Sequence, residues 1–170
     1  MASRQSIEDA IKASEARLQR LLPMMESYEN LPLLDDGGKW SVRGALSHIA
    51  ASAHVTVGAQ RALDRAAGKA PPPAPSGPQM SGDERNEQQI KDRMHKSIAE
   101  IVEETKQGHA KALEDVKGMN DMVLGTKVAG MGANAPRVSA SGLIMRQIEY
   151  HEGGQIDRIE YAIKSKTRWL

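Results

Sequence analysis

The sequence predicts an all-α protein, a bundle of four amphipathic helices. Apolar residues recur at helical spacing in four long segments, and no segment sustains the period-two alternation of a strand. The apolar volume comes from Ala, Ile, Leu and nine Met, with no Phe, a composition that fills helix–helix interfaces more readily than sheet faces. A chain of 170 residues is long enough for one domain with a real core.

The first two segments lie in the N-terminal half. The first helix is expected from about Ser6 to Tyr28, where Pro23 should bend or break the last turns. Its apolar stripe consists of Ile7, Ile11, Ser14, Leu18, Leu21, Leu22 and Met25. The second helix is expected from Ser41 to about Gly68, because Ser41 is a good N-cap that follows a Gly37–Gly38 break.

The other two segments follow in the C-terminal half. A Ser-x-x-Glu capping box from Ser97 to Glu100 opens the third helix. Its stripe consists of Ile98, Ile101, Val102, Thr105, Ala112 and Val116. The fourth helix is expected from about Ser141 to Lys166, with Ile144, Ile148, Ile159 and Ala162 on one side.

Two connections are unusually long. Residues 69–82 are rich in proline and should form an extended, exposed crossover, which allows the second and third helices to run in the same direction. Residues 118–140 combine glycines and Pro136 with apolar residues. We expect this second connection to lie across one end of the bundle as a lid.

Charge and cysteine content exclude several function classes. The net charge of +1 gives no support for a nucleic-acid partner or an anionic membrane surface. The absence of cysteine excludes disulfides, thiolate metal ligands and a nucleophilic thiol of the protein itself, so any thiol would arrive as a co-substrate. Residues 1–7 contain no apolar leader and no run approaches the roughly 20 apolar residues of a membrane span, so we expect a soluble, cytoplasmic protein.

His48 is the first candidate site residue. It flanks the apolar stripe of the second helix, and its neighbours one turn away are small: Gly44, Ala45, Ala51 and Ser52. The imidazole should therefore stand beside a hollow that could admit a ligand or a metal ion. The alternative is a half-buried histidine with its hydrogen bonds satisfied.

The fourth helix carries the second candidate group. At 100° per residue, Gln147, His151 and Gln155 fall on the stripe that should be buried. Side chains four residues apart can present two ligands to one ion, as in other His-x-x-x-His sites. A core hydrogen-bond network is the alternative, because buried polar groups need partners.

These residues carry a resemblance to a known superfamily. The Trp40–Ser41 start, followed by Leu46 and the run 48–51 (His-Ile-Ala-Ala), resembles the second helix of the DinB/YfiT-like superfamily, which includes thiol-dependent transferases and mycothiol-dependent maleylpyruvate isomerases. Segments 86–90 and 97–104 resemble its DfsB/ClbS branch. The resemblance implies an up-down-down-up bundle, a segment 86–87 near the pocket, and a divalent metal, zinc or nickel, bound by the helix-two histidine and a His-x-x-x-His pair on the last helix.

The match to that pair is incomplete in every register. With His151 on the family's first histidine, Gln155 takes the place of the second. The other registers offer Ile148 with Glu152, or Gln147 with His151. Neutral glutamine is a poor zinc or nickel ligand, so we expect metal binding to be weak or lost.

The remaining histidines should not be ligands. His109 falls on the apolar face of the third helix and is expected to line the interior as a packed or hydrogen-bonded group. His54 and His95 have no polar partners at useful spacing and are expected at the surface.

Three functions remain open. One is a metal-dependent protein that acts on a small molecule as a hydrolase or thiol-dependent transferase, with His48 and His151 facing one pocket and their ring nitrogens within about 8 Å. The second is a metal-free small-molecule binding or protective protein of the DfsB/ClbS type, and the third is a dimeric helical protein without pocket chemistry. We expect a homodimer because several apolar residues fall outside the main stripes, namely Met24, Leu31, Leu33, Leu34, Trp169 and Leu170.

Overall fold

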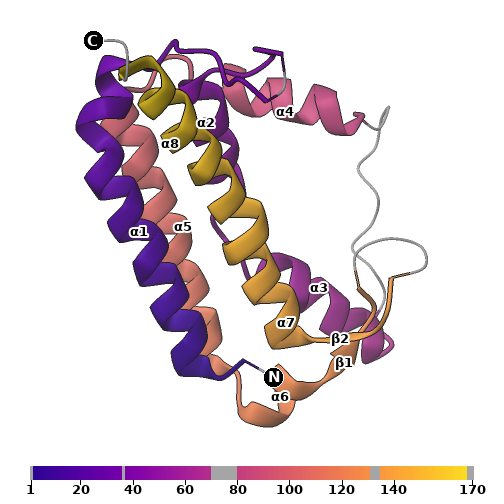
Figure 1. Ribbon diagram of the computed structural model, residues 1–170. Helices are drawn as coiled ribbons and strands as arrows, with labels where there is room; N and C mark the ends of the chain where they lie inside the picture. The colour runs from indigo at the N-terminus through magenta and orange to yellow at the C-terminus, as the bar shows by residue number, and fades with distance from the viewer. Residues whose placement is uncertain (1, 36, 70–79, 131–134, 168–170) are drawn as a thin grey trace.

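The computed structural model describes residues 2–35, 37–69, 80–130 and 135–167, and these are mostly helical (Figure 1). The elements are α1 (Arg4–Ser27), α2 (Val42–Ser52), α3 (Val57–Ala66), α4 (Gly82–Lys91), α5 (Ile98–Gly118), α6 (Asp121–Gly125), β1 (Lys127–Val128), β2 (Val138–Ser139), α7 (Ala140–Arg146), η1 (Gln147–Glu152) and α8 (Gly153–Thr167). The all-α prediction is confirmed. None of the described helices is both long and apolar enough to cross a membrane.

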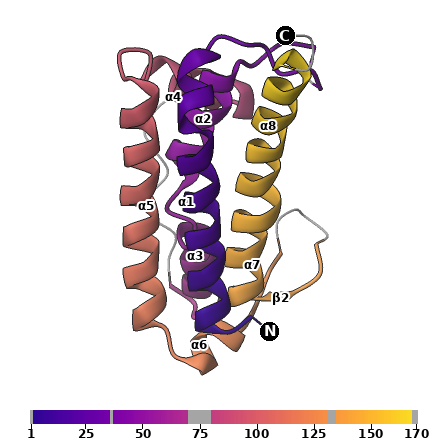
Figure 2. The same ribbon diagram turned by 60° about the vertical axis from the view of Figure 1, so that its left-hand side comes forward.

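Four helical stretches lie side by side along the molecule. α5 contacts both α1 and α2, and α8 contacts the same two helices from the other side. The colours in Figures 1 and 2 show that α1 and α8 run toward one end of the molecule, whereas α2 and α5 run toward the other. α2 and α5 are therefore parallel neighbours. Most of the connection predicted as the crossover, residues 70–79, lies outside the described residues.

Serine N-caps open the helices where the sequence predicted them. Ser41 Oγ accepts a hydrogen bond from Gly44 N, and Ser97 forms the predicted capping box with Glu100. A second capping box joins Ser81 and Glu84 at the start of α4. Each cap satisfies backbone N–H groups that lack an intrahelical partner.

Pro23 does not break the first helix, which continues to Ser27. Met25, in the last turn, is fully buried in the core, so tertiary packing holds the turn that proline would weaken. Pro23 was predicted to bend or break the last turns, and of these two effects the break is contradicted by the continuous helix.

The second helix is interrupted, contrary to the expectation of one helix from Ser41 to Gly68. α2 ends at Ser52, and a turn leads to α3 at Val57. His54 Nε2 and Thr56 Oγ1 in this turn both bond to Asp115 of α5, at 2.7 and 2.6 Å. The prediction that His54 has no polar partner is therefore wrong, because its partner comes from a distant helix.

Close packing at the same turn requires a glycine. A Cβ atom on Gly108 of α5 would lie 2.7 Å from the Cβ atom of Ala53, closer than such atoms approach in proteins. Gly108 thus lets α5 approach the end of α2.

The fourth helix spans the predicted range but contains a π-helical segment, η1, between α7 and α8. The preceding connection forms α6 and a small hairpin with antiparallel register Lys127↔Ser139 and Val128↔Val138. Both elements lie across one end of the molecule (Figure 1), where Leu124 and Val128 are buried. Residues 131–134 of this connection lie outside the described residues.

The core has two apolar clusters separated by polar residues. Along α1, Ile7 and Ile11 belong to one cluster and Leu18 and Leu21 to the other, with buried Ser14 between them. The same order recurs on the fourth helical stretch, where buried Glu152 separates Ile148 from Ile156.

On α5, buried His109 separates Val102 of one cluster from Ala112 of the other. Ser14, His109 and Glu152 therefore form a polar layer inside an otherwise apolar core.

Three of the apolar residues proposed for a dimer interface differ in exposure. Leu33 is fully buried in the core of its own chain, so its assignment to an interface is wrong. Leu34 remains 55% exposed and Met24 38% exposed. Residues 169 and 170 lie outside the described residues.

Candidate functional site

Two histidines from different helices meet inside the molecule. His48 of α2 and His151 of η1 are 103 positions apart in sequence, yet their Nε2 atoms lie 2.9 Å apart. Their ring centroids are separated by 4.8 Å. The predicted proximity of the two rings is confirmed.

A glutamine contacts the outer nitrogen of each ring. The Oε1 atom of Gln89 lies 2.9 Å from His48 Nδ1, and Gln147 Nε2 lies 3.0 Å from His151 Nδ1. Because an amide oxygen only accepts, His48 must donate from Nδ1 and leave its Nε2 free to accept. His151 then accepts from Gln147 at Nδ1 and donates from Nε2 to His48, so one tautomer of each ring satisfies all three hydrogen bonds.

The hydrogen bonds of this arrangement are complete without a charge on either imidazole. Burial lowers the pKa of His151, and the electrostatic effect of nearby His48 lowers it further, which together outweigh the opposite effect of Glu152. A neutral ring is the form of histidine that binds metal ions or relays a proton.

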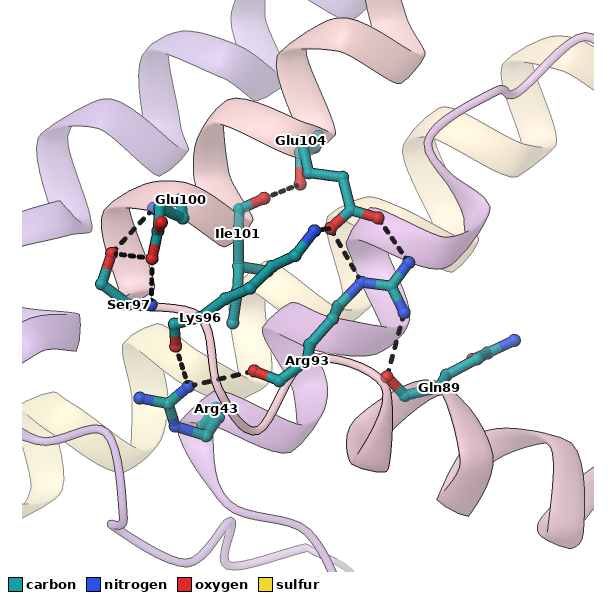
Figure 3. A network of polar contacts seen from close by, with 9 residues as sticks. Arg43, Gln89, Arg93, Lys96, Ser97, Glu100, Ile101 and Glu104 are labelled. Carbon is teal, nitrogen blue, oxygen red and sulfur yellow. Dashed lines mark hydrogen bonds and ion pairs between the residues drawn. The ribbon is translucent and has the colours of Figure 1, made fainter.

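Gln89 reaches His48 from α4, which lies beside α2. None of the residues of α4 is buried, so apolar packing alone does not fix this helix. Beyond its end, Arg93 pairs with Glu104 of α5 at 2.5 Å, and Lys96 reaches the same carboxylate at 2.9 Å (Figure 3). Arg43 of α2 donates to the Lys96 carbonyl at 2.6 Å. The network holds the end of α4 from which the Gln89 side chain extends.

The charge of Glu104 is stabilised in this network. Partial burial would raise the pKa of its carboxyl, but hydrogen bonds from Arg93 and Lys96 and their charges bring it below the usual value. Glu104 thus stays ionised and keeps both cations engaged at neutral pH.

Trp40 packs against the ring of His48. Its ring meets His48 edge-on at 5.1 Å between centroids, and the Arg158 guanidinium lies 5.7 Å from the Trp40 centroid. Arg158 Nε also contacts both carboxylate oxygens of Asp35, at 2.9 and 2.7 Å. Arg158 donates from Nη1 to Gln155 Oε1 at 2.8 Å, so the amide oxygen of this candidate ligand already accepts a hydrogen bond.

Glu152 and His109 form a second polar group, inside the core. Glu152 is 1% exposed and accepts a hydrogen bond from Ser14 Oγ and another from His109 Nε2, the latter at 3.0 Å. Glu15 lies 3.3 Å from His109 Nδ1. The prediction that His109 is a buried, hydrogen-bonded group is confirmed, and its partners are these carboxylates rather than the histidine pair.

Burial lowers the pKa of His109, but the hydrogen bond and charge of Glu152, together with the charge of Glu15, outweigh burial and raise it above 6.5. The shift therefore favours the cationic form of His109 opposite Glu152. The carboxylate of Glu152, which one register offered as a third metal ligand, is therefore already engaged with His109.

Sequence reasoning missed Gln89 and Trp40 as neighbours of His48. The signal for Gln89 was its position two residues after segment 86–87, which the resemblance implied to be near the pocket, and Trp40 belongs to the helix-start pattern itself. In the part of the chain that the structure describes, no three His, Asp or Glu side chains gather closely enough to hold a metal ion. The site is therefore a pair of imidazoles flanked by two neutral amides.

Comparisons with known proteins assign no family to this chain. It matches no protein-family model, no curated protein and no solved structure.

Proposed function

We propose that this chain is a DinB/YfiT-like four-helix bundle with up-down-down-up order, whose His48–His151 pair binds a divalent ion, zinc or nickel, weakly and supports hydrolysis or thiol-dependent transfer on a small molecule. The observation that carries the proposal is the 2.9 Å between the two Nε2 atoms. Two neighbouring nitrogen ligands about 2.1 Å from one ion are separated by about 3.0 Å in the square-planar or octahedral geometry of nickel and by about 3.4 Å in the tetrahedral geometry of zinc. The pair thus has the spacing of two neighbouring ligands.

The directions of the helices support the fold assignment. α2 and α5 are parallel neighbours, and α1 and α8 run against them (Figure 2). This order requires a long crossover between the second and third long helices, where the proline-rich segment 69–82 lies.

Gln89 and Gln147 would orient the two ligand rings. A histidine that binds through Nε2 carries its proton on Nδ1 and donates it to a neighbouring acceptor. Gln89 Oε1 already accepts from His48 Nδ1, and rotation of the Gln147 amide by 180° would offer its oxygen to His151 Nδ1. Gln147 therefore fits the role of an orienting residue better than that of a third ligand.

The third ligand position explains the weak binding that we propose. Glu152 would have to leave Ser14 and His109, which would abandon a buried ion pair. Gln155, one turn beyond His151, remains the candidate, and its neutral amide binds zinc or nickel less well than imidazole.

When bound, a divalent ion would supply Lewis acidity toward a water or a thiol. The chain contains no cysteine, so a thiol would have to be a small co-substrate. Trp40 packs edge-on against the His48 ring, and the flanking amides fix the rotation of both rings.

Calorimetric titration with nickel after chelation tests the proposal. We expect weak binding by the wild type, loss of binding in His48→Gln, and at least tenfold tighter binding in Gln155→His, because imidazole replaces an amide. His95→Gln, at an exposed position, is the matched control and should bind as the wild type does. Equal affinities of the wild type and Gln155→His would exclude Gln155 as a ligand position.

A second candidate function is metal-free binding or protection of the DfsB/ClbS type. It is favoured by the row of hydrogen bonds from Gln147 through His151 and His48 to Gln89, which is complete without an ion. Native mass spectrometry of untagged protein separates the two. A mass increment of an organic ligand without metal, together with no nickel binding, would favour this candidate.

A further inference from the structure

A pocket of about 350 Å³ lies between α3, the end of the hairpin strand β1 and the start of the fourth helical stretch. Small and apolar residues form much of its wall, including Gly58, Ala59, Ala62 and Leu143. The volume is within the range of about 300–1,000 Å³ that is typical of ligand pockets. The pocket can therefore hold a small organic molecule.

The charged residues that line this pocket are both arginines. Arg61 and Arg65 lie four residues apart on α3, so they are neighbours on one face of the helix. Among the described residues neither makes an ion pair, whereas Arg17, Arg43 and Arg93 each pair with a carboxylate.

Two like charges at this spacing repel each other, and an anion between them would remove that cost. An arginine fork also matches the two oxygens of a carboxylate.

Gln147 connects the pocket to the histidine pair. It lines the pocket, and its Nε2 atom bonds to His151 Nδ1 at 3.0 Å. A ligand in the pocket is thus one side chain away from His151. No hydrogen bond between described residues uses the Gln147 oxygen, which leaves it available to a ligand donor.

We propose that this pocket binds a small organic anion with an apolar body, with its carboxylate between Arg61 and Arg65 and its hydrocarbon part against Ala59, Ala62 and Leu143. The inference concerns a separate pocket and does not depend on metal binding by the histidines. A phosphate group could use the same arginines, but the apolar wall favours an organic acid over an inorganic anion.

Binding of hexanoate to the full chain, followed by nuclear magnetic resonance titration, tests the proposal. We expect saturable binding, a shift of the Gln147 side-chain amide signals, and little binding of 1-hexanol, which has the same body without the charge. The signals of Gln147 are identified by their loss in Gln147→Leu.

Substitution then locates the site. We expect the Arg61→Gln/Arg65→Gln double variant to bind hexanoate at least tenfold more weakly, since charge-assisted hydrogen bonds are lost. Arg85→Gln, an exposed arginine of α4, is the matched control and should bind as the wild type does. Circular dichroism of each variant verifies its fold.

A second variant fills the pocket without changing its charge. A Cβ atom on Gly58 would meet no atom within 4 Å, so Gly58→Leu is tolerated by the helix and reduces the space available. We expect it to weaken hexanoate binding severalfold.

Three results would overturn the proposal. One is equal hexanoate affinity of the wild type and the double arginine variant, and another is the absence of hexanoate binding up to about 10 mM, the weak end of specific binding. The third is inorganic phosphate that binds as tightly as hexanoate, which would show that the apolar wall contributes nothing.

Discussion

The buried pair of Glu152 and His109 makes a measurable prediction about stability. Glu152→Gln keeps the shape of the side chain but removes the charge that faces His109, which is itself fully buried. Removal of one partner of a buried ion pair costs about 3–5 kcal/mol. Because the amide oxygen can still accept one hydrogen bond, we expect a loss near the lower end, about 3 kcal/mol at pH 6.

The pH dependence of this loss follows from the pKa of His109. Glu152 and Glu15 raise that pKa above 6.5 in the folded protein, despite burial. A raised histidine pKa stabilises the fold fully below the pKa of the unfolded chain, and the stabilisation is lost as the pH rises through the folded pKa. The difference in unfolding free energy between wild type and variant should therefore be largest near pH 6 and smaller at pH 9, where neutral His109 only donates a hydrogen bond to the Glu152 carboxylate.

Urea unfolding at pH 6 and pH 9 measures both values. A loss of about 3 kcal/mol corresponds to a melting temperature lower by about 6–12 °C in a protein of this size. Glu149→Gln, an exposed glutamate on the same helical segment, is the matched control and should change stability by less than about 0.5 kcal/mol. A variant that loses less than about 1 kcal/mol at pH 6, or keeps the wild-type pH dependence, would refute the assignment of a charged pair.

Three further predictions concern packing, the site and assembly. Gly108→Ala should lower the free energy of unfolding, measured in urea, by about 1–3 kcal/mol, because the added Cβ atom would overlap Ala53. Gly154→Ala is the control: a Cβ atom there meets nothing within 4 Å, so the change should be neutral or stabilising. Glu104→Gln should speed amide hydrogen exchange in α4 at least tenfold and leave exchange in α1 unchanged, because the carboxylate anchors Arg93 and Lys96 next to that helix. Light scattering should give the mass of a homodimer. Leu34→Glu, at an exposed apolar residue, should lower the measured mass toward that of a single chain. A wild-type mass equal to one chain at every concentration would contradict the dimer.

Periodicity and capping signals predicted most of the helices because those signals are local. Ser41 and Ser97 cap helices where the sequence indicated, and the apolar stripes of α1 and α5 are buried as expected. The break after Ser52 could not be predicted, since it depends on Asp115 of α5, about sixty positions away, and on the close approach of Gly108. A continuous apolar pattern does not reveal where a distant helix will interrupt it.

The sequence indicated the two histidines of the candidate site but not which residues contact them. His48 and His151 stood out because polar side chains interrupted or flanked apolar stripes. The two glutamine partners differ in how far the sequence indicates them. Gln147 is one helical turn from His151, whereas Gln89 comes from α4, a helix that has no buried face to indicate its position. Gln155 fell on the same predicted stripe as His151, yet its oxygen bonds to Arg158.

Two adjacent residues of the π-helical segment, His151 and Glu152, belong to different polar groups. A π-turn inserts one extra residue into a helix and shifts the faces that follow it. Within η1, His151 points to His48 and Gln147, while the adjacent Glu152 enters the core to meet Ser14 and His109. Because π-turns concentrate at functional sites, the irregularity itself supports a role for the histidine pair beyond packing.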